Sequence, residues 1–122
     1  MIVNFFASWC TDCQAELSAF AVASRRLAGR VDFIGIDTHE TDTSSAIAEV
    51  RRARDAYPIG VDQTSLGGQT IADLYLVGAL PETFFIDAAG RVESFVPGRE
   101  TVSGLLAGAR PLLSQASNTA GG

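Results

Sequence analysis

VNFFASWCTDCQAEL, residues 3–17, is the stretch of this sequence that decides the fold. Its first part is short, apolar and rich in β-prone side chains, which predicts a buried strand over Ile2–Phe6. A short turn follows, and the spacing of the apolar residues then predicts a helix over Thr11–Leu27. Two cysteines, Cys10 and Cys13, stand where the turn passes into the helix.

The cysteine pair has the spacing of a reactive dithiol. Two cysteines are too few for a scaffold held together by disulfides, and closing so short a loop gains little entropy. A dithiol exchanges disulfides when one thiolate attacks the substrate disulfide and the second thiol then resolves the mixed disulfide. Because a helix N-terminus stabilises a thiolate, we expect Cys10 to be the nucleophile and the more buried Cys13 to be the resolving cysteine.

The rest of the chain predicts an α/β domain. A helix between the first two strands implies a right-handed parallel crossover, and a later hairpin adds antiparallel strands, so we expect a mixed central β-sheet flanked by helices. The domain is expected over residues 1–113, with a disordered small-residue tail over 114–122. The elements expected after the first helix are a strand at 31–36, a helix at 46–56, a short strand and loop at 58–68, a short helix at 69–75, a hairpin of strands 83–86 and 92–96, and a helix at 99–115 that bends or ends near Pro111.

The composition excludes some classes of function. The 122 residues carry a formal net charge of −5, and the dense basic cluster at residues 51–54 is flanked by acidic residues, so no nucleic-acid partner is expected. No run of about 20 apolar residues predicts a membrane span, and no signal-like leader precedes the first strand. Because the chain opens directly in a strand, we expect an upstream segment to be missing, together with any signal peptide or membrane anchor that it carries.

Two segments of the chain resemble a known family. Residues 3–17, with Trp-Cys-Thr-Asp-Cys at the start of a helix, are similar to the active-site segment of TlpA/ResA-type thioredoxin-like proteins. YLVGALPETFFIDAAGRV, residues 75–92, resembles the segment of that family in which a cis-proline faces the cysteine pair. The resemblance runs from Ile2 to about Leu113. It implies a thioredoxin fold from which the family's N-terminal strand or hairpin is missing.

The resemblance also implies an activity and a substrate site. The family consists of extracytoplasmic thiol–disulfide oxidoreductases, several of which serve cytochrome c maturation. We therefore expect a membrane-tethered reductase of protein disulfides, with apocytochrome c as the leading candidate substrate and an upstream dithiol donor. By this resemblance the Leu80–Pro81 bond is cis and its loop offers backbone groups to the substrate, while Pro81, Glu82 and Thr83 match the CcmG (DsbE) branch. A monomer without a bound cofactor is expected, since the dithiol is itself the redox centre.

Three residues around the cysteines are expected to tune them. Asp12 stands where this fold commonly has proline, and its charge beside the Cys10 thiolate disfavours ionisation, which makes the couple more reducing. Thr11 is expected to tune the turn without a catalytic role. Trp9 is expected to form part of the exposed surface around the site rather than the core.

The proton of Cys13 needs an acceptor. Ordinary thioredoxin has a buried aspartate where this chain has Asn4, and an amide cannot accept a proton. Glu82 is therefore the expected base. The alternative is that Glu82 is a solvent-exposed residue at the start of a strand.

Other functions remain open alternatives. A copper chaperone on the same fold typically has three residues between its cysteines and a downstream histidine, whereas His39 lies in a polar loop and is expected to be exposed. No set of four zinc ligands is evident, so no metal is expected. A thiol peroxidase would place its cysteine in a Pro-x-x-x-Thr-x-x-Cys setting, which residues 3–10 lack. An inert folding disulfide is the last alternative.

Overall fold

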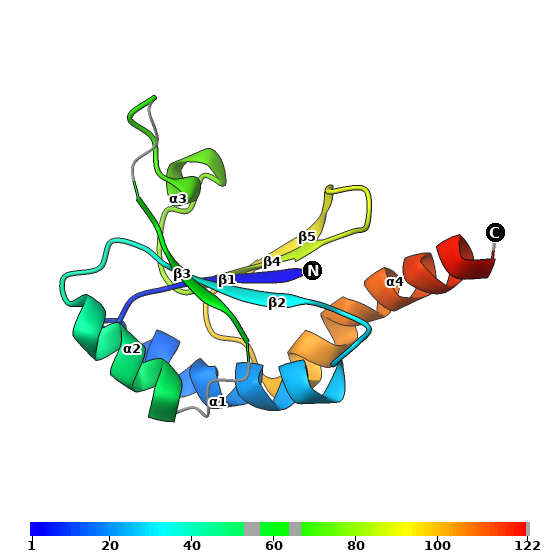
Figure 1. Cartoon of the computed structure of the whole chain (residues 1–122), viewed down its shortest axis with the longest axis horizontal. Helices are drawn as coiled ribbons and strands as arrows, with labels where there is room; N and C mark the ends of the chain where they lie inside the picture. Colours follow the sequence, from blue (N-terminus) through cyan, green and yellow to red (C-terminus); the bar gives the residue numbers. More distant parts are fainter. Residues whose placement is uncertain (53–56, 64–66, 122) are drawn as a thin grey trace.

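A five-stranded mixed sheet with strand order β3-β2-β1-β4-β5 forms the centre of the molecule (Figure 1). The computed structural model describes residues 1–52, 57–63 and 67–121. Strands β1, β2 and β3 run parallel, and β4 and β5 complete the sheet as antiparallel strands, as the sequence predicts. The strands are β1 Ile2–Phe6, β2 Phe33–Asp37, β3 Ile59–Val61, β4 Glu82–Ile86 and β5 Val92–Pro97, and the helices are α1 Thr11–Arg26, α2 Thr43–Arg52, α3 Ile71–Leu74 and α4 Val102–Gly121.

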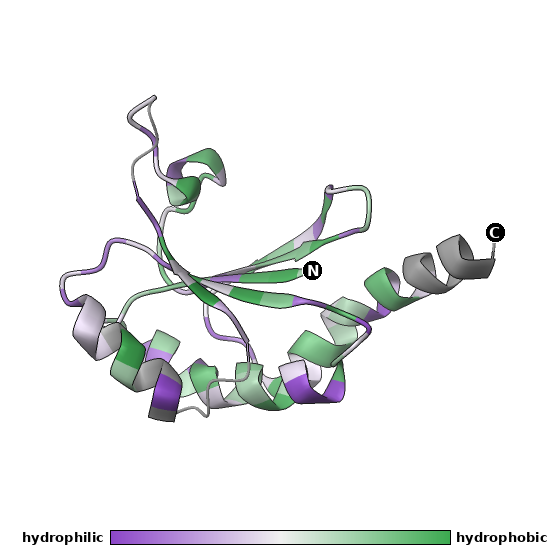
Figure 2. Ribbon diagram, in the orientation of Figure 1, coloured by the Kyte–Doolittle hydropathy of each residue, from purple (hydrophilic) through white to green (hydrophobic). Residues whose placement is uncertain are grey.

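β1 is buried along its length and mostly apolar because both of its faces are covered (Figure 2). Ile2 belongs to the core cluster that includes residues of α1 and α4, and Phe6 packs with the two cysteines. Val3 and Phe5 face the opposite side, where α3 contributes to a second core cluster. Since successive side chains of a strand alternate, Asn4 lies on the same face as Ile2 and Phe6, beneath α1.

α1 carries the cysteine pair and is fixed to the sheet by its buried face. Leu17, Phe20 and Ala23 are all at most 3% exposed, and Phe20 and Ala23 join the main core cluster. The helix has an acidic residue in its first turn and two arginines in its last, which suits the helix dipole. Over the described residues, no helix has the length and apolarity that crossing a membrane requires.

The last helix differs from the prediction at both of its ends. The side chain of Thr101 accepts a hydrogen bond from the backbone N–H of Gly104 at 3.1 Å, so α4 begins at Val102 rather than at residue 99. Pro111 lies inside α4 and does not end it, because Ala109 and Leu112 on either side are buried against the core. The helix continues through residues 114–121, where the sequence predicted a disordered tail. The domain boundary at residue 113 stays a prediction.

α2 begins three residues before its predicted start. The Asp42 carboxylate accepts hydrogen bonds from the backbone N–H groups of Ser44 and Ser45 at 3.1 and 3.3 Å, which caps the helix there. The predicted end of this helix, residues 53–56, lies outside the described residues, as does the part of the predicted strand and loop at 64–66.

Gly108 lets α4 approach β4 closely. A Cβ atom at this position would overlap the ring of Phe85, which is 1% exposed and belongs to the main core cluster. We expect Gly108→Ala to lower the free energy of unfolding by about 1–3 kcal/mol through overpacking, even though alanine favours the helix. Urea unfolding followed by circular dichroism measures this effect. Gly60→Ala is the control, since a Cβ atom there meets nothing within 4 Å; equal losses in the two variants would contradict the packing argument.

Candidate active site

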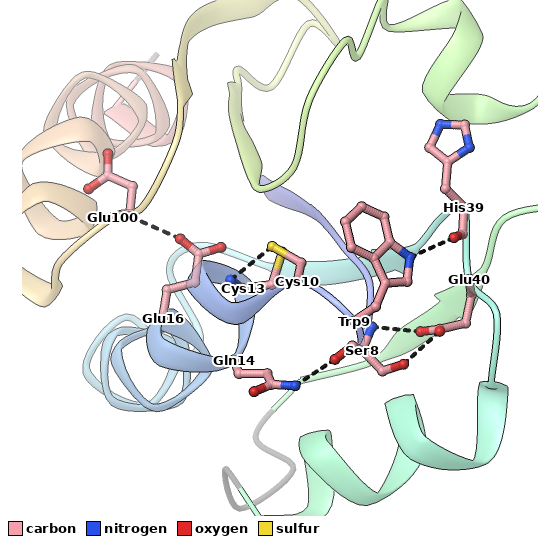
Figure 3. Close-up of a disulfide and its surroundings, with 9 residues drawn as sticks. All are labelled: Ser8, Trp9, Cys10, Cys13, Gln14, Glu16, His39, Glu40 and Glu100. Carbon is pink, nitrogen blue, oxygen red and sulfur yellow. Dashed lines mark hydrogen bonds between the residues drawn. A yellow bond between two sulfur atoms is a disulfide. The ribbon is translucent and has the colours of Figure 1, made fainter.

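The two cysteines form a disulfide at the N-terminus of α1 (Figure 3). Their Cα atoms are 5.2 Å apart, and Cys10 is the N-cap residue, with its Sγ accepting a hydrogen bond from the backbone N–H of Cys13 at 3.2 Å. Cys10 is 6% exposed and Cys13 is 1% exposed. The sulfur predicted to be the nucleophile is therefore the more accessible one, and it lies where a backbone donor stabilises a thiolate.

The loop before β4 lies against the disulfide. The Leu80–Pro81 peptide bond is cis, as the resemblance implies, and the Leu80 side chain packs on the cluster formed by Phe6 and the two cysteines. The carbonyl of Pro81 accepts a hydrogen bond from Gly98 at 2.8 Å, which ties this loop to the end of β5. The structure thus brings together two segments that are about seventy residues apart in the sequence, as expected of this site.

Glu82 and Thr83 follow in β4 and are both buried. Glu82 is 8% exposed and pairs with Phe5 of β1 in the sheet register, so the alternative of a solvent-exposed strand-start residue is wrong. Thr83 lies directly opposite Asn4 and is fully buried. The role of Glu82 as a base stays a prediction.

Trp9 is 54% exposed and lies beside the disulfide, as the sequence predicts (Figure 3). Its indole N–H donates to the carbonyl oxygen of His39 at 2.8 Å. His39 is exposed, and its imidazole points away from the disulfide (Figure 3). Within the described part of the chain, no cluster of three or more His, Cys, Asp or Glu residues could hold a metal ion.

Asp12 is exposed in the first turn of α1, directly between the cysteines in sequence. Its negative charge opposes the Cys10 thiolate, so removing the charge stabilises the reduced form. We expect Asp12→Asn to shift the redox potential of the couple by on the order of 10–30 mV towards less negative values. Equilibration with glutathione buffers measures the shift, and an unchanged or more negative potential would sink this account of Asp12.

Glu16 is a buried carboxyl group that the sequence analysis missed. It lies three residues after Cys13 in α1, so both side chains project from the same face of the helix. Glu16 is 0% exposed, and one carboxylate oxygen accepts a hydrogen bond from the backbone N–H of Glu100 at 2.9 Å. Burial raises the pKa of Glu16 to about 8, although the bond from Glu100 opposes the shift. The spacing Cys13-x-x-Glu16 was the available sequence signal.

Asn4, Thr83 and Tyr57 supply further buried polar groups to the core beneath α1. Asn4 is fully buried, and neither polar atom of its side chain has a hydrogen-bond partner among the residues described. Burial and the nearby charge of Glu16 raise the pKa of the Tyr57 hydroxyl. Because neither an amide nor a neutral hydroxyl is a useful base, none of these three side chains is a candidate proton acceptor for Cys13.

The sequence comparisons agree with this geometry. The AhpC/TSA family matches residues 1–95. Thiol-disulfide oxidoreductase ResA of Bacillus thuringiensis (strain Al Hakam) is 29% identical over 102 residues, which cover 83% of this chain and 56% of that protein. The chain thus spans about half the length of the curated relatives that it matches.

Solved structures share the fold. A thiol:disulfide interchange protein of the thioredoxin family from Chlorobium tepidum TLS superposes with a TM-score of 0.74 at 24% identity, covering 92% of this chain and 78% of that one. A secreted Mycobacterium tuberculosis disulfide oxidoreductase homologous to Escherichia coli DsbE gives 0.71 at 22% identity, with coverages of 87% and 79%. The thioredoxin-like fold expected from the sequence is therefore confirmed. From the match over residues 1–95, together with a cysteine pair beside a cis-proline, the chain belongs to the AhpC/TSA family.

Proposed function

We propose that this domain is a thiol–disulfide oxidoreductase that reduces protein disulfides through Cys10 and Cys13. The observation that carries the proposal is the disulfide at the N-terminus of α1, against the loop that ends in the cis-proline. A disulfide that only stabilised the fold would not need to lie at the N-cap of a helix or against the loop that ends in the cis-proline. The names of the relatives, which are thiol–disulfide oxidoreductases, support the same activity.

The reaction proceeds in two exchanges. The Cys10 thiolate attacks one sulfur of the substrate disulfide, forming a mixed disulfide and releasing the other substrate sulfur as a thiolate that takes up a proton. The Cys13 thiolate then attacks the Cys10 sulfur, which frees the second substrate thiolate and leaves the Cys10–Cys13 disulfide. Two electrons pass from the dithiol to the substrate, so no bound cofactor is needed, and a separate dithiol donor restores the reduced pair.

Glu16 is the proposed proton acceptor for Cys13. The two side chains share one face of α1, and Cys13 is too buried to exchange its proton freely with solvent. The pKa of Glu16, about 8, lies close to the ordinary thiol value of about 8.5, so a proton moves between the two groups at little energetic cost. Glu82 is the second candidate for the proton acceptor of Cys13, because the sequence has Asn4, which cannot accept a proton, where thioredoxin has a buried aspartate.

The proposed substrate and location rest on the family resemblance. We place the full-length protein outside the cytoplasm, tethered through an upstream segment; the secreted Mycobacterium tuberculosis protein of the same fold is consistent with this. Apocytochrome c is the proposed substrate, because residues 81–83 match the CcmG branch. The protein is expected to act as a monomer.

The redox potential of the Cys10–Cys13 couple, measured by equilibration with glutathione or dithiothreitol buffers, tests the proposal. A value near the thioredoxin end of the range, about −270 mV, supports a reductase, whereas a value near −120 mV would mean that the protein makes disulfides. Reduction of a disulfide-containing test protein by the dithiol form must accompany the first result. A peroxide-consumption assay separates the peroxidase alternative that the AhpC/TSA match raises.

A further inference from the structure

Glu40, in the loop after β2, holds the turn that precedes Cys10 (Figure 3). Its carboxylate accepts hydrogen bonds from the backbone N–H and the hydroxyl of Ser8 at 2.8 and 2.6 Å. The backbone N–H groups of Thr41 and Asp42 donate to the same carboxylate at 2.9 and 3.0 Å. The loop after β2 and the turn after β1, 32 residues apart in sequence, are thus joined through one side chain.

The same turn is held from its other side. The side chain of Gln14, in the first turns of α1, donates to the carbonyl of Ser8 at 2.5 Å, and the Trp9 indole donates to the carbonyl of His39. His39 adopts φ 52°, in the left-handed region that non-glycine residues rarely occupy. The backbone on both sides of Glu40 therefore contributes to holding residues 8 and 9.

Asp37, the last residue of β2, is a second carboxyl group, close enough to Glu40 to feel its charge. It is 1% exposed, and within the described chain neither of its carboxyl oxygens receives a hydrogen bond from a donor group. Burial and the neighbouring Glu40 raise the pKa of Asp37 to about 8. Although burial opposes it, the hydrogen bonds from Ser8 and from the backbone of Asp42 lower the pKa of Glu40.

We propose that Glu40 is a positioning residue for the Cys10 nucleophile, fixing the Ser8–Trp9 turn through the hydrogen bonds that its carboxylate accepts. The inference rests on the proposed function and adds a device outside the cysteine-bearing helix. The backbone N–H of Cys10 bonds to the carbonyl of Ala7 at 3.2 Å, so the turn sets where the Cys10 sulfur stands relative to the donor N–H of Cys13. A loosened turn weakens that donation and destabilises the thiolate.

The sign of one shift separates positioning from simple electrostatics. If Glu40 acted only through its charge, removing that charge would lower the pKa of the Cys10 thiol. If Glu40 positions the turn, the pKa of the Cys10 thiol rises in Glu40→Gln, because an amide cannot accept from all the N–H donors around it. Glu40→Asp keeps the charge but shortens the side chain, so it should raise the pKa as well.

The experiment measures the pH profile of Cys10 alkylation by iodoacetamide, in the full chain with Cys13→Ser so that only one thiol reacts. We expect Glu40→Gln and Glu40→Asp to slow alkylation below the thiol pKa by about three- to tenfold. The proposal would be overturned if the pKa of the Cys10 thiol fell in Glu40→Gln and stayed at the parent value in Glu40→Asp. Ser8→Ala removes only the hydroxyl donor to Glu40 and should slow the alkylation of Cys10 less. If the Glu40 variants do not fold, Ser8→Ala provides the test, and an unchanged alkylation rate in it would contradict the positioning role. The readout needs no substrate, so a parent protein that reduces no disulfides would refute the proposed function without touching this result.

Discussion

Cys10→Ser is expected to abolish disulfide reduction, whereas Cys13→Ser is expected to stop the reaction at the mixed disulfide. A serine hydroxyl is not ionised near neutral pH, so the first variant has no nucleophile. The second keeps the Cys10 thiolate at the N-cap of α1 but has no second sulfur to release the substrate. Non-reducing electrophoresis of each variant with a disulfide-containing test protein shows the difference directly, as an adduct that dithiothreitol removes.

The assignment of roles is what this pair of variants tests. An adduct with Cys10→Ser and none with Cys13→Ser would reverse the roles. Equal, slow turnover in both variants would mean that the pair is not the reacting centre. Both serine variants lose the disulfide, so circular dichroism on each, compared with the reduced parent protein, shows that a difference in trapping does not come from a difference in folding.

The parts of the site that could be predicted from the sequence are those set by local signals. An apolar strand, a turn and a helix start within one short stretch place Cys10 and Cys13, and a proline before a β-prone segment marks the loop that faces them. The burial of Glu16 was not predicted, because a single glutamate in a helix is usually exposed to solvent. Its burial comes from the chain around Glu100, which packs over it from 84 residues away.

Non-local packing also explains the other differences. The sequence left Glu82 open between a base and a solvent-exposed residue at the start of a strand. The pairing of β4 with both β1 and β5 buries it. α4 passes through Pro111 because the core holds the residues on either side of it. Glu40 and Ser8 join two loops, and no pattern in the sequence of either loop predicts this contact. In each case the missing information was which distant segment covers the residue.

Glu16→Gln is expected to slow the second exchange by about a hundredfold at neutral pH, the lower range of what a positioned base contributes. Glutamine can still accept the hydrogen bond from Glu100, so the fold is expected to persist. In the parent protein the rate of the second exchange should rise with pH through about 8, as Glu16 loses its proton. In Glu16→Gln the contribution of Glu16 should disappear, which leaves only the rise that comes from ionisation of Cys13 itself. Rapid-quench kinetics on a preformed mixed disulfide measures the step, and Glu82→Gln is the matched variant.

Stability gives an independent measure of the same carboxyl group. Because folding raises the pKa of Glu16 from 4.5 to about 8, the folded protein binds more protons than the unfolded chain between these values. The stabilising contribution is therefore complete below pH 4.5 and is lost as the pH rises through about 8, with a slope of up to about 1.4 kcal/mol per pH unit. Urea unfolding of the oxidised protein should show a shallower fall from pH 5 to 8 in Glu16→Gln than in the parent. If the two curves run parallel while Glu82→Gln weakens the pH dependence of the second exchange, the proton acceptor is Glu82, and Glu16 is a structural link between α1 and the chain that leads into α4.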